Sequence, residues 1–583
     1  MRVASFIAVL LLGLPAGCGG KGGSSQARAG GQGGDTGAGG TAGIVDAGSD
    51  SFGADTTSAL PKDALSTLPP LQAAIACPDP PLTGTVRYVC DCGPGHADGC
   101  QAGNDSADGT SPKTAWRSWA KGQSAFASLP AGGIISFCRG GSIQVGGKDR
   151  RDWINYQCRR DQRCVVRDYV PEGAVSDLPR PILSVATDDL FDIEDGGDPD
   201  HDEGYIYLNL DVSGGGTANQ AFFVYNDSDD VLICNVHIDG FQIAVNIQGS
   251  NPKGSGNGDG KNERIVLRNS QVTNNSNQGW LGGCDGCSVE YSVFDNNGFN
   301  EAVFNHNIYF DGSGNDENIV GNVLTRSAVV NGTCQAVSLV AHGVHDGMRI
   351  VGNKVAEAPG SASPGCWGIA VDTGYSEAEG FHNLTIDGNI VQDVGNLSIG
   401  IAACDTCVIE NNVVIQSQEG TAISAPDRDR GADDTPESAV TIRNNSILFK
   451  SGVSGTAIAL GSEGTGNVVV SNAIKTGGGS NGACFQADLP PTAYAAFNYN
   501  VCDPGAGSWV ESVGKLKDWQ SKTGFDASSL ASDPGYDAAS PPYALSVGPS
   551  SPLVGAGDPV HSSPTTIAGV ARGTPPDVGA YQR

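Results

Sequence analysis

The sequence has few charged residues, and basic ones are the scarcer kind. Asp, Glu, Lys and Arg make up only 17% of the 583 residues, and 34 basic side chains stand against 64 acidic ones, for a formal net charge of -30. A protein that binds nucleic acid needs clustered Lys and Arg to neutralise phosphates. The composition therefore excludes a nucleic-acid-binding body.

Long hydrophobic runs are also scarce. The clear one, Val3–Leu14, follows a basic start and precedes Pro15, Ala16 and Gly17. It is too short to span a bilayer, which takes about 20 apolar residues. A charged start, a short apolar run and small residues are typical of a secretory signal. We predict a signal peptide over residues 1–17 and an exported protein.

Cys18 directly follows these small residues, and this arrangement resembles the lipobox of bacterial lipoproteins. The resemblance implies that Cys18 carries a diacylglyceryl group, which would be the only membrane anchor of an outer-membrane or cell-surface lipoprotein. Cleavage of an ordinary secretory signal nearby is the alternative. Residues 18–76 are rich in Gly and Ser and begin with a long stretch that offers almost nothing to bury, so we expect a disordered tether.

The body lacks the composition of a helical protein. Glycine is abundant, with 84 residues, roughly twice the usual share. Long helices would need fewer glycines and more Ala, Leu, Glu and Lys. Instead, short runs with period-two alternation of β-branched residues recur, which indicates strands with one buried face.

One phrase repeats along the body: an alternating apolar run that is broken by an asparagine. Successive copies lie from 23 residues (269 to 292) to 36 residues (353 to 389) apart, which indicates stacked supersecondary units. We expect the asparagine amide to bond its equivalents in the coils above and below. The copies centre on Asn209, Asn235, Asn269, Ser292, Asn322, Asn353, Asn389, Asn412, Asn445 and Asn472.

Several short strands per unit without helices between them resemble the right-handed parallel β-helix (pectate lyase-like) superfamily. The resemblance implies an all-β right-handed parallel β-helix solenoid of about ten coils, with an N-terminal cysteine-rich cap. An Ig-like sandwich array and a propeller are the alternatives, but propeller blades need about 40 residues and four strands each.

The domain boundaries follow from the same patterns. We predict a cysteine-rich cap and first coils over 77–200, β-helix repeats over 201–505, and a C-terminal tail over 506–583 that packs on the helix. Ser111 and Pro112, followed by Trp116, Trp119 and Phe126, predict one short amphipathic helix that closes an end of the core.

Sixteen of the 17 cysteines remain if Cys18 is lipidated, and an even number in an exported protein predicts disulfides. Two Cys-x-x-Cys pairs precede asparagine strands, and we expect local bridges rather than zinc or redox sites. Cys334 and Cys366 open equivalent strands 32 residues apart, so we predict a bridge between neighbouring coils. The two local pairs are Cys284 with Cys287 and Cys404 with Cys407.

Enzymes of this superfamily place their active groove on an outer face of the coils. Between the asparagine copies a second short strand pattern recurs, as in Ile308–Asp311 and Ile369–Asp372. Polar residues at outward positions of this second strand in three coils form our candidate catalytic cluster, because an imidazole or phenol beside carboxylates can move protons or bind a cation. Solvated strand edges are the alternative. The cluster comprises His306, Tyr309, Asp311, His342 and Asp372; rings expected to face sugars are Tyr309, Trp280, Trp367 and Tyr375.

An acidic stretch over 192–203 offers several oxygens to a hard cation, so calcium is the one cofactor we consider. A solvated acidic insertion is the alternative, because charge runs usually face water. The candidate ligands are Asp192, Glu194, Asp195, Asp198, Asp200 and Asp202.

These observations predict an exported protein that binds or processes a polysaccharide at the cell surface. An enzyme of this kind would be a polysaccharide lyase, an epimerase or a glycoside hydrolase; a non-catalytic adhesin or structural protein is the alternative. The complete motif series of pectin-degrading hydrolases is absent. A net charge of -30 repels uronate polymers, a difficulty that neutral glycans avoid.

Metabolic labelling tests the anchor. Cys18→Ala removes the only thiol that the signal offers for lipidation, so palmitate incorporation should be abolished while the body still folds. Undiminished labelling of the variant would contradict the lipoprotein prediction.

Overall fold

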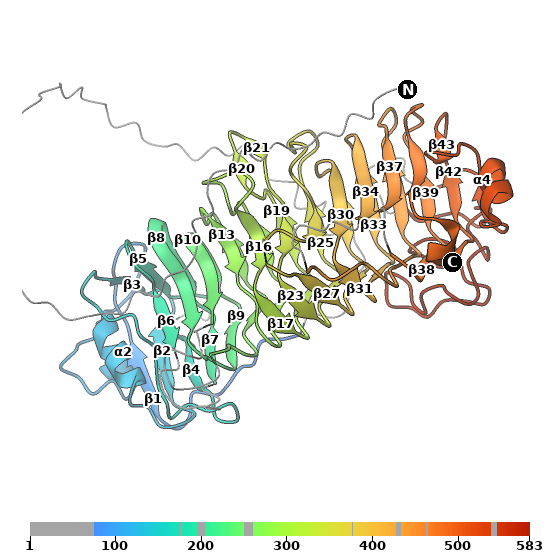
Figure 1. Cartoon of the computed structure of the whole chain (residues 1–583). Helices are drawn as coiled ribbons and strands as arrows, with labels where there is room; N and C mark the ends of the chain where they lie inside the picture. Colours follow the sequence, from blue (N-terminus) through green and yellow to red (C-terminus); the bar gives the residue numbers. More distant parts are fainter. Residues whose placement is uncertain are drawn as a thin grey trace, which may run out of the picture. The chain divides into compact units, whose positions relative to one another are not determined.

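The computed structural model describes residues 75–174, 177–194, 204–249, 260–375, 377–426, 433–461, 464–537 and 545–583. The chain forms a right-handed parallel β-helix, which confirms the predicted fold class. Figure 1 shows the coils following one another along the axis in sequence order. The β-helical coils contribute strands to three long faces, and neighbouring coils pair in parallel.

The first face is a 14-stranded parallel sheet. All ten copies of the predicted repeat supply strands to it, and β1, β2, β4 and β41 add four more, because the cysteine-rich region is itself wound into coils. In order, its strands are β1 (Val86–Val89), β2 (Ile134–Cys138), β4 (Cys164–Tyr169), β7 (Tyr205–Leu208), β9 (Val231–Cys234), β11 (Val266–Arg268), β14 (Ser288–Glu290), β18 (Asn318–Val320), β24 (Arg349–Val351), β28 (Thr385–Asp387), β32 (Val408–Glu410), β35 (Thr441–Arg443), β38 (Asn467–Val470) and β41 (Tyr494–Asn498).

Two long bent strands, β8 (Asp211–Tyr225) and β10 (His237–Gln248), run through a corner and so join the second and third faces. The second face also contains β3 (Ser142–Val145), β5 (Ile182–Val185), β12 (Gln271–Thr273), β15 (Val293–Asp295), β19 (Val323–Thr325), β25 (Lys354–Ala356), β29 (Ile390–Gln392), β33 (Val413–Gln416), β36 (Ser446–Phe449), β39 (Ala473–Lys475), β42 (Val501–Asp503) and β44 (Leu530–Ala531).

The third face carries the second strand pattern of the sequence. It contains β6 (Phe191–Glu194), β13 (Gln278–Leu281), β16 (His306–Phe310), β22 (Leu339–Ala341), β26 (Ile369–Val371), β30 (Leu397–Ile401), β34 (Gly420–Ala425), β37 (Gly455–Leu460), β40 (Ala483–Ala487) and β43 (Ser508–Val510). A four-stranded corner sheet follows it, with β17 (Ser313–Asn315), β23 (Val344–Asp346), β27 (Gly380–His382) and β31 (Cys404–Asp405); β20 (Val329–Val330) and β21 (Thr333–Cys334) form a hairpin.

A ladder of buried asparagines fixes the coil register at the turn after the first face. Each side-chain amide nitrogen donates to the amide oxygen of the next coil at 3.0 or 3.1 Å, and a backbone N–H donates to the same oxygen. The amide therefore satisfies polar groups of three coils inside the core. The ladder consists of Asn322, Asn353, Asn389, Asn412, Asn445, Asn472 and Asn500.

In the first three coils the asparagines lie outside the buried ladder: Asn235 donates to Asn209 at 2.6 Å, as expected for neighbouring coils, whereas Asn269 donates to the Ile75 carbonyl oxygen. Asn209, Asn235 and Asn269 lie one position earlier, where the backbone has positive φ angles of 57°, 55° and 50°. Asparagine tolerates this left-handed conformation better than most residues. Leu210, Val236 and Ser270 occupy the ladder position in these coils, and Ser292 occupies it in the fourth; each of the two serines accepts a backbone N–H at 3.1 Å.

Short helices lie near the two ends of the solenoid (Figure 1). The predicted single helix is two: η1 (Pro112–Thr114) and α2 (Trp119–Phe126). They are separated because Trp116 pairs with Val89 in a parallel bridge. Trp119 and Phe126 are buried, as the amphipathic pattern predicts. At the other end are α4 (Leu516–Thr523), which buries Trp519, and η2 (Pro491–Ala493).

Eight disulfides join all sixteen cysteines from residue 77 onward. The bridges Cys284–Cys287, Cys404–Cys407 and Cys334–Cys366 match the pairs predicted from spacing, and Cys77–Cys234 joins residues 157 positions apart. The others are Cys90–Cys138, Cys92–Cys100, Cys158–Cys164 and Cys484–Cys502.

The segment 545–583 packs on the outside of the second face. Ile567 and Leu553 are buried among outward apolar residues of β29, β33, β39 and β42. Arg572 donates to the side-chain oxygen of Asn411 at 2.7 Å. In the described part of the chain, no helix is both long enough and apolar enough to cross a membrane.

Asn412→Ala tests the ladder. It removes the acceptor of two Asn389 N–H groups and a donor to Ile386, so the free energy of unfolding should fall by about 2 kcal/mol or more. Asn481→Ala, in an exposed turn, is the matched control and should change it by less than about 0.5 kcal/mol. Urea unfolding measures both, and equal effects would contradict a stabilising role for the ladder.

Candidate functional site

The candidate site lies where the third face turns into the corner sheet. Gly312 and Gly343 make this turn with φ angles of 84° and 118°. A Cβ at Gly343 would lie 2.0 Å from the Gly312 carbonyl oxygen, so the two coils approach here only because Gly343 lacks a side chain. Beside this turn lies an open groove of about 670 Å³.

Three of the five predicted residues form one row across neighbouring coils. Phe310, Ala341 and Val371 are paired in register, so the residues that follow them, Asp311, His342 and Asp372, are also equivalent. From the strand patterns alone, Val340 would be aligned with Asp311 and Asp372, and His342 would lie two residues beyond this row. That alignment is wrong, because β22 pairs Val340 with Tyr309.

Of the five predicted catalytic residues, Asp311 is the one that lines the groove. Burial raises the pKa of its carboxyl group to about 6, an effect that the His345 and His342 side chains oppose. His342 is partly exposed; its Nδ1 bonds the Asp372 carbonyl oxygen and lies 3.7 Å from the Asp372 carboxylate. The Asp372 side chain is only 8% exposed.

Aromatic rings enclose His342 on two sides. The rings of Tyr309 and Tyr375 lie 5.7 and 5.4 Å from the imidazole, and the two phenol groups hydrogen-bond each other. Burial raises the pKa of Tyr309 well above its ordinary value and that of Tyr375 to about 12. Both phenols are therefore protonated at neutral pH.

His306 lies beneath this group rather than in the groove. Its side chain is buried, and Nδ1 bonds the Val337 carbonyl oxygen at 2.8 Å. Burial lowers its pKa to about 4, so the imidazole is neutral. Its ring is 5.3 Å from that of Tyr309, which gives it a packing contact with the cluster.

The outward position predicted for Trp280 is wrong, and Asn307, which the strand alternation of Ile308 and Phe310 also places outward, is not exposed either. Trp280 is fully buried and stacks on Phe310 at 5.7 Å inside the core. Asn307 is also buried, bonding Asn297 and Ser338 in a second polar ladder. Of the rings proposed to face sugars, Tyr375 is exposed, whereas Trp367 and Tyr309 are partly exposed.

Glu379 is a buried carboxylate that the sequence analysis missed. Its oxygens accept the backbone N–H groups of Gly343, Gly374 and Tyr375 at 2.8, 2.6 and 2.7 Å. It thereby holds the glycine turn and the loop that carries the exposed tyrosine. Its isolated position in Ala378-Glu379-Gly380 gives no periodic signal that would identify it.

Glu317 and His345 form a buried pair under the groove that the sequence analysis also missed, and neither side chain is exposed. His345 Nδ1 bonds Glu317, and Nε2 bonds the His342 carbonyl oxygen at 3.1 Å. The pKa of His345 is raised because its bonds to Glu317 and the nearby carboxylates outweigh burial. The pair fits because Gly283 and Gly314 leave room: a Cβ there would lie 2.8 and 2.4 Å from Glu317 Oε1.

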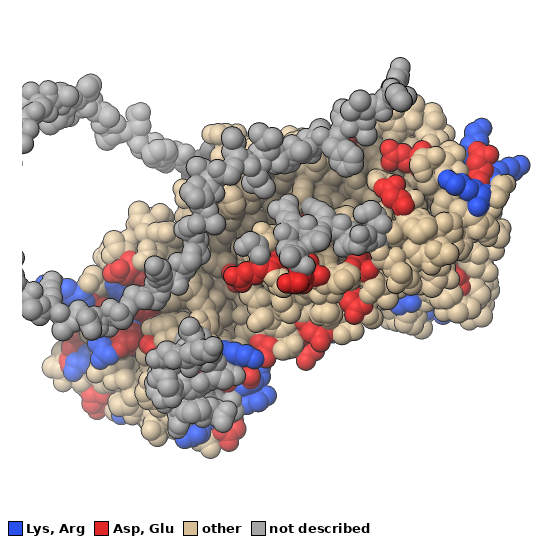
Figure 2. All heavy atoms as spheres, in the orientation of Figure 1, with Lys and Arg blue, Asp and Glu red and all other residues tan. Residues whose placement is uncertain are grey.

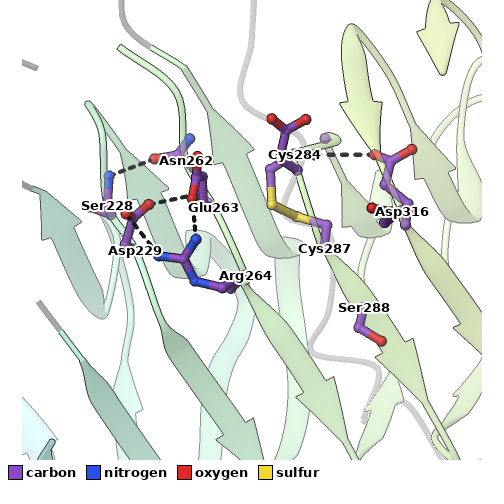
Figure 3. Close-up of a disulfide and its surroundings, with 12 residues drawn as sticks. Ser228, Asp229, Asn262, Glu263, Arg264, Cys284, Cys287, Ser288 and Asp316 are labelled. Atoms are coloured by element: carbon purple, nitrogen blue, oxygen red, sulfur yellow. Dashed lines mark hydrogen bonds and ion pairs between the residues drawn. A yellow bond between two sulfur atoms is a disulfide. The ribbon is translucent and has the colours of Figure 1, made fainter. Parts of the chain in front are cut away.

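Two further carboxylates, Asp285 and Asp346, line the groove with Asp311. Asp285 Oδ1 accepts both N–H groups of Asn315, at 2.9 and 2.8 Å, and Asp346 accepts from Asn383 at 2.7 Å. The Cys284–Cys287 disulfide closes the turn that contains Asp285. Figure 3 shows this disulfide opposite the segment that contains Asn262, Glu263 and Arg264. Asn262 also lines the groove.

The predicted calcium ligands lie elsewhere. Glu194 accepts from Tyr225 and Asn226 at 2.8 and 2.6 Å, and burial raises the pKa of Asp192 to about 7. The remaining four, Asp195, Asp198, Asp200 and Asp202, are outside the described residues. Calcium binding at this loop stays a prediction.

The solved structures that this chain resembles are distant from it in sequence. No family model matches the chain, and no curated protein matches it. A pectate lyase structure is 12% identical, covering 86% of this chain and 97% of its own, with a TM-score of 0.36. A lacto-N-biosidase from Eubacterium ramulus is 10% identical, covering 66% and 68%, with a TM-score of 0.41. A mannuronan C-5 epimerase module from Azotobacter vinelandii is 14% identical, covering 60% and 93%, with a TM-score of 0.33.

The raised pKa of Asp311 has a measurable consequence for stability. A carboxyl whose folded pKa, about 6, exceeds its unfolded value of about 3.9 destabilises the fold as the pH rises through this window. Asp311→Asn should therefore raise the free energy of unfolding at pH 7 by up to about 3 kcal/mol, and by much less at pH 4.

Urea unfolding at the two pH values measures this difference. Asp488→Asn, which changes an exposed carboxylate remote from the groove, is the control and should show no such pH dependence. If Asp311→Asn changed the free energy of unfolding equally at both pH values, the raised pKa of Asp311 would be contradicted.

Proposed function

We propose that this chain is an exported protein, lipid-anchored through Cys18, that binds and hydrolyses a polysaccharide at the cell surface. The observation that carries the proposal is the groove beside the glycine turn. Asp311 lines it with a carboxyl that keeps its proton to about pH 6, and Asp346 lines it from the next coil. Glycoside hydrolysis is usually catalysed by a pair of carboxyl groups, one of which donates a proton.

The reaction assigns one role to each group. Asp311 donates its proton to the glycosidic oxygen while the bond from that oxygen to the anomeric carbon breaks. A water molecule attacks the anomeric carbon, and Asp346 accepts the proton that this water loses. Proton return from Asp346 to Asp311 through solvent restores the starting state.

Two of the predicted proton-moving groups, Tyr309 and His306, are unsuited to a lyase or epimerase reaction. Those reactions need a base that removes a sugar proton near neutral pH. The Tyr309 phenol holds its proton too strongly for this, and His306 is buried with its Nδ1 bonded to a carbonyl group. His342, Asp372 and Glu379 are positioning residues that shape the wall behind Asp311.

The remaining features of the chain support export. Eight disulfides are typical of a protein outside the cytoplasm. The lipid on Cys18 would keep the body at the surface, where polysaccharide is available.

Reducing-end release from a panel of polysaccharides tests the reaction. Asp311→Asn removes the proton donor and should lower kcat by at least about 100-fold. Wild-type kcat should fall as the pH rises above about 6, because Asp311 then loses its proton. Glu511→Gln, an exposed change far along the solenoid, should leave both unchanged.

A wild-type protein that binds a polysaccharide without releasing ends would identify a non-catalytic adhesin instead. Release of unsaturated products would identify a lyase. Either result would contradict the proposed hydrolysis.

A further inference from the structure

The groove is lined by carboxylates and has almost no positive charge. Asp285, Asp311 and Asp346 contribute three carboxyl groups, and Lys261 is the one cation among its described lining residues. Figure 2 shows the same imbalance more broadly, with acidic side chains gathered over the middle of the face in view and basic ones mainly toward the two ends.

Two other basic side chains near the groove are already bonded to acidic partners. Arg264 donates to Asp230 at 2.9 Å and to Asp229 at 3.2 Å, and it also pairs with Glu263 (Figure 3). His345 is bonded to Glu317 beneath the groove. These side chains are therefore committed within the protein, and a sugar carboxylate in the groove would face like charges.

The other lining groups are neutral hydrogen-bonding groups. They include the exposed side chains of Gln248, Ser313 and Asn315. Amides and hydroxyls of this kind bind sugar hydroxyls by donating and accepting together. The lining is thus matched to a ligand that has many hydroxyl groups and no charge.

The groove follows the solenoid axis rather than a single coil. Asn262, Asp285, Asn315 and Asp346 come from four successive coils, as the pairings of Glu263 with Asp285 and of β17 with β23 show. With about 4.8 Å between coils, they span roughly 14 Å, the length of several sugar rings. A chain laid along the axis would contact all four coils at once.

We propose that this groove takes an uncharged polysaccharide, laid along the axis over four coils, and excludes uronate chains. The proposal rests on the function proposed above. Uronates would meet three carboxyl groups. Amino sugars are disfavoured for a different reason: an ammonium group beside Asp311 would favour its ionised form and remove the proton that the reaction uses.

Affinity electrophoresis of Asp311→Asn tests the charge of the ligand without hydrolysis. The probes are native gels containing dextran, xyloglucan or galactomannan as neutral chains, polygalacturonate or alginate as anionic chains, and glycol chitosan as a cationic one. At least one neutral gel should retard the variant, and the anionic gels should not. Retardation by charged gels alone, or by no neutral gel, would overturn the proposal.

A second variant tests whether the groove itself sets this selectivity. Asp285→Asn combined with Asp346→Asn removes two like charges and should raise affinity for polygalacturonate about tenfold. Glu511→Gln, with one exposed charge removed elsewhere, should not. An unchanged affinity in the double variant would overturn the assignment to this groove.

The outcomes separate this inference from the proposed reaction. Neutral chains that bind Asp311→Asn but are not cleaved by the wild type would end the hydrolase proposal and leave the ligand assignment standing. Cleavage of an anionic chain by the wild type would support the hydrolase proposal and end the assignment of an uncharged ligand.

Discussion

Register between neighbouring coils is the constraint on which this molecule depends. Backbone pairing alone tolerates slippage where strands have only three residues, and most strands of the first face have three or four. The buried asparagine ladder removes that freedom, because a slip by one residue would leave amide groups unpaired in the core. Buried polar hydrogen bonds therefore specify the register between the coils, and the apolar rows stabilise the coils in that register.

The candidate site is a consequence of that register. Asp311, His342 and Asp372 become neighbours only because three coils are aligned residue by residue. The glycine turn then lets the coils approach, and the buried Glu317–His345 pair occupies the space that Gly283 and Gly314 leave. Long-range stacking thus brings together groups that are about 30 residues apart in sequence.

Most of the fold was predictable from sequence, because strand alternation and the recurring asparagine are local signals. The site was predictable only in part. Asp311, His342 and Asp372 were found from strand pattern. Glu379 lies in a loop, and His345 and Asp346 lie in a short corner strand whose direction depends on the backbone conformation of the turn before it, as at Gly343. Trp280 was placed outward because an alternating pattern does not say which of its two sides is the core.

The Cys77–Cys234 bridge determines where the solenoid meets the rest of its chain. Cys234 ends β9, the fifth strand of the first face, and Ile75 accepts a hydrogen bond from Asn269 in the next coil. Tension on the chain before Cys77 would enter the body sideways through β9, not along the axis from its end. The covalent link would carry this tension past residues 78–233, so the coils that precede β9 would not have to bear it.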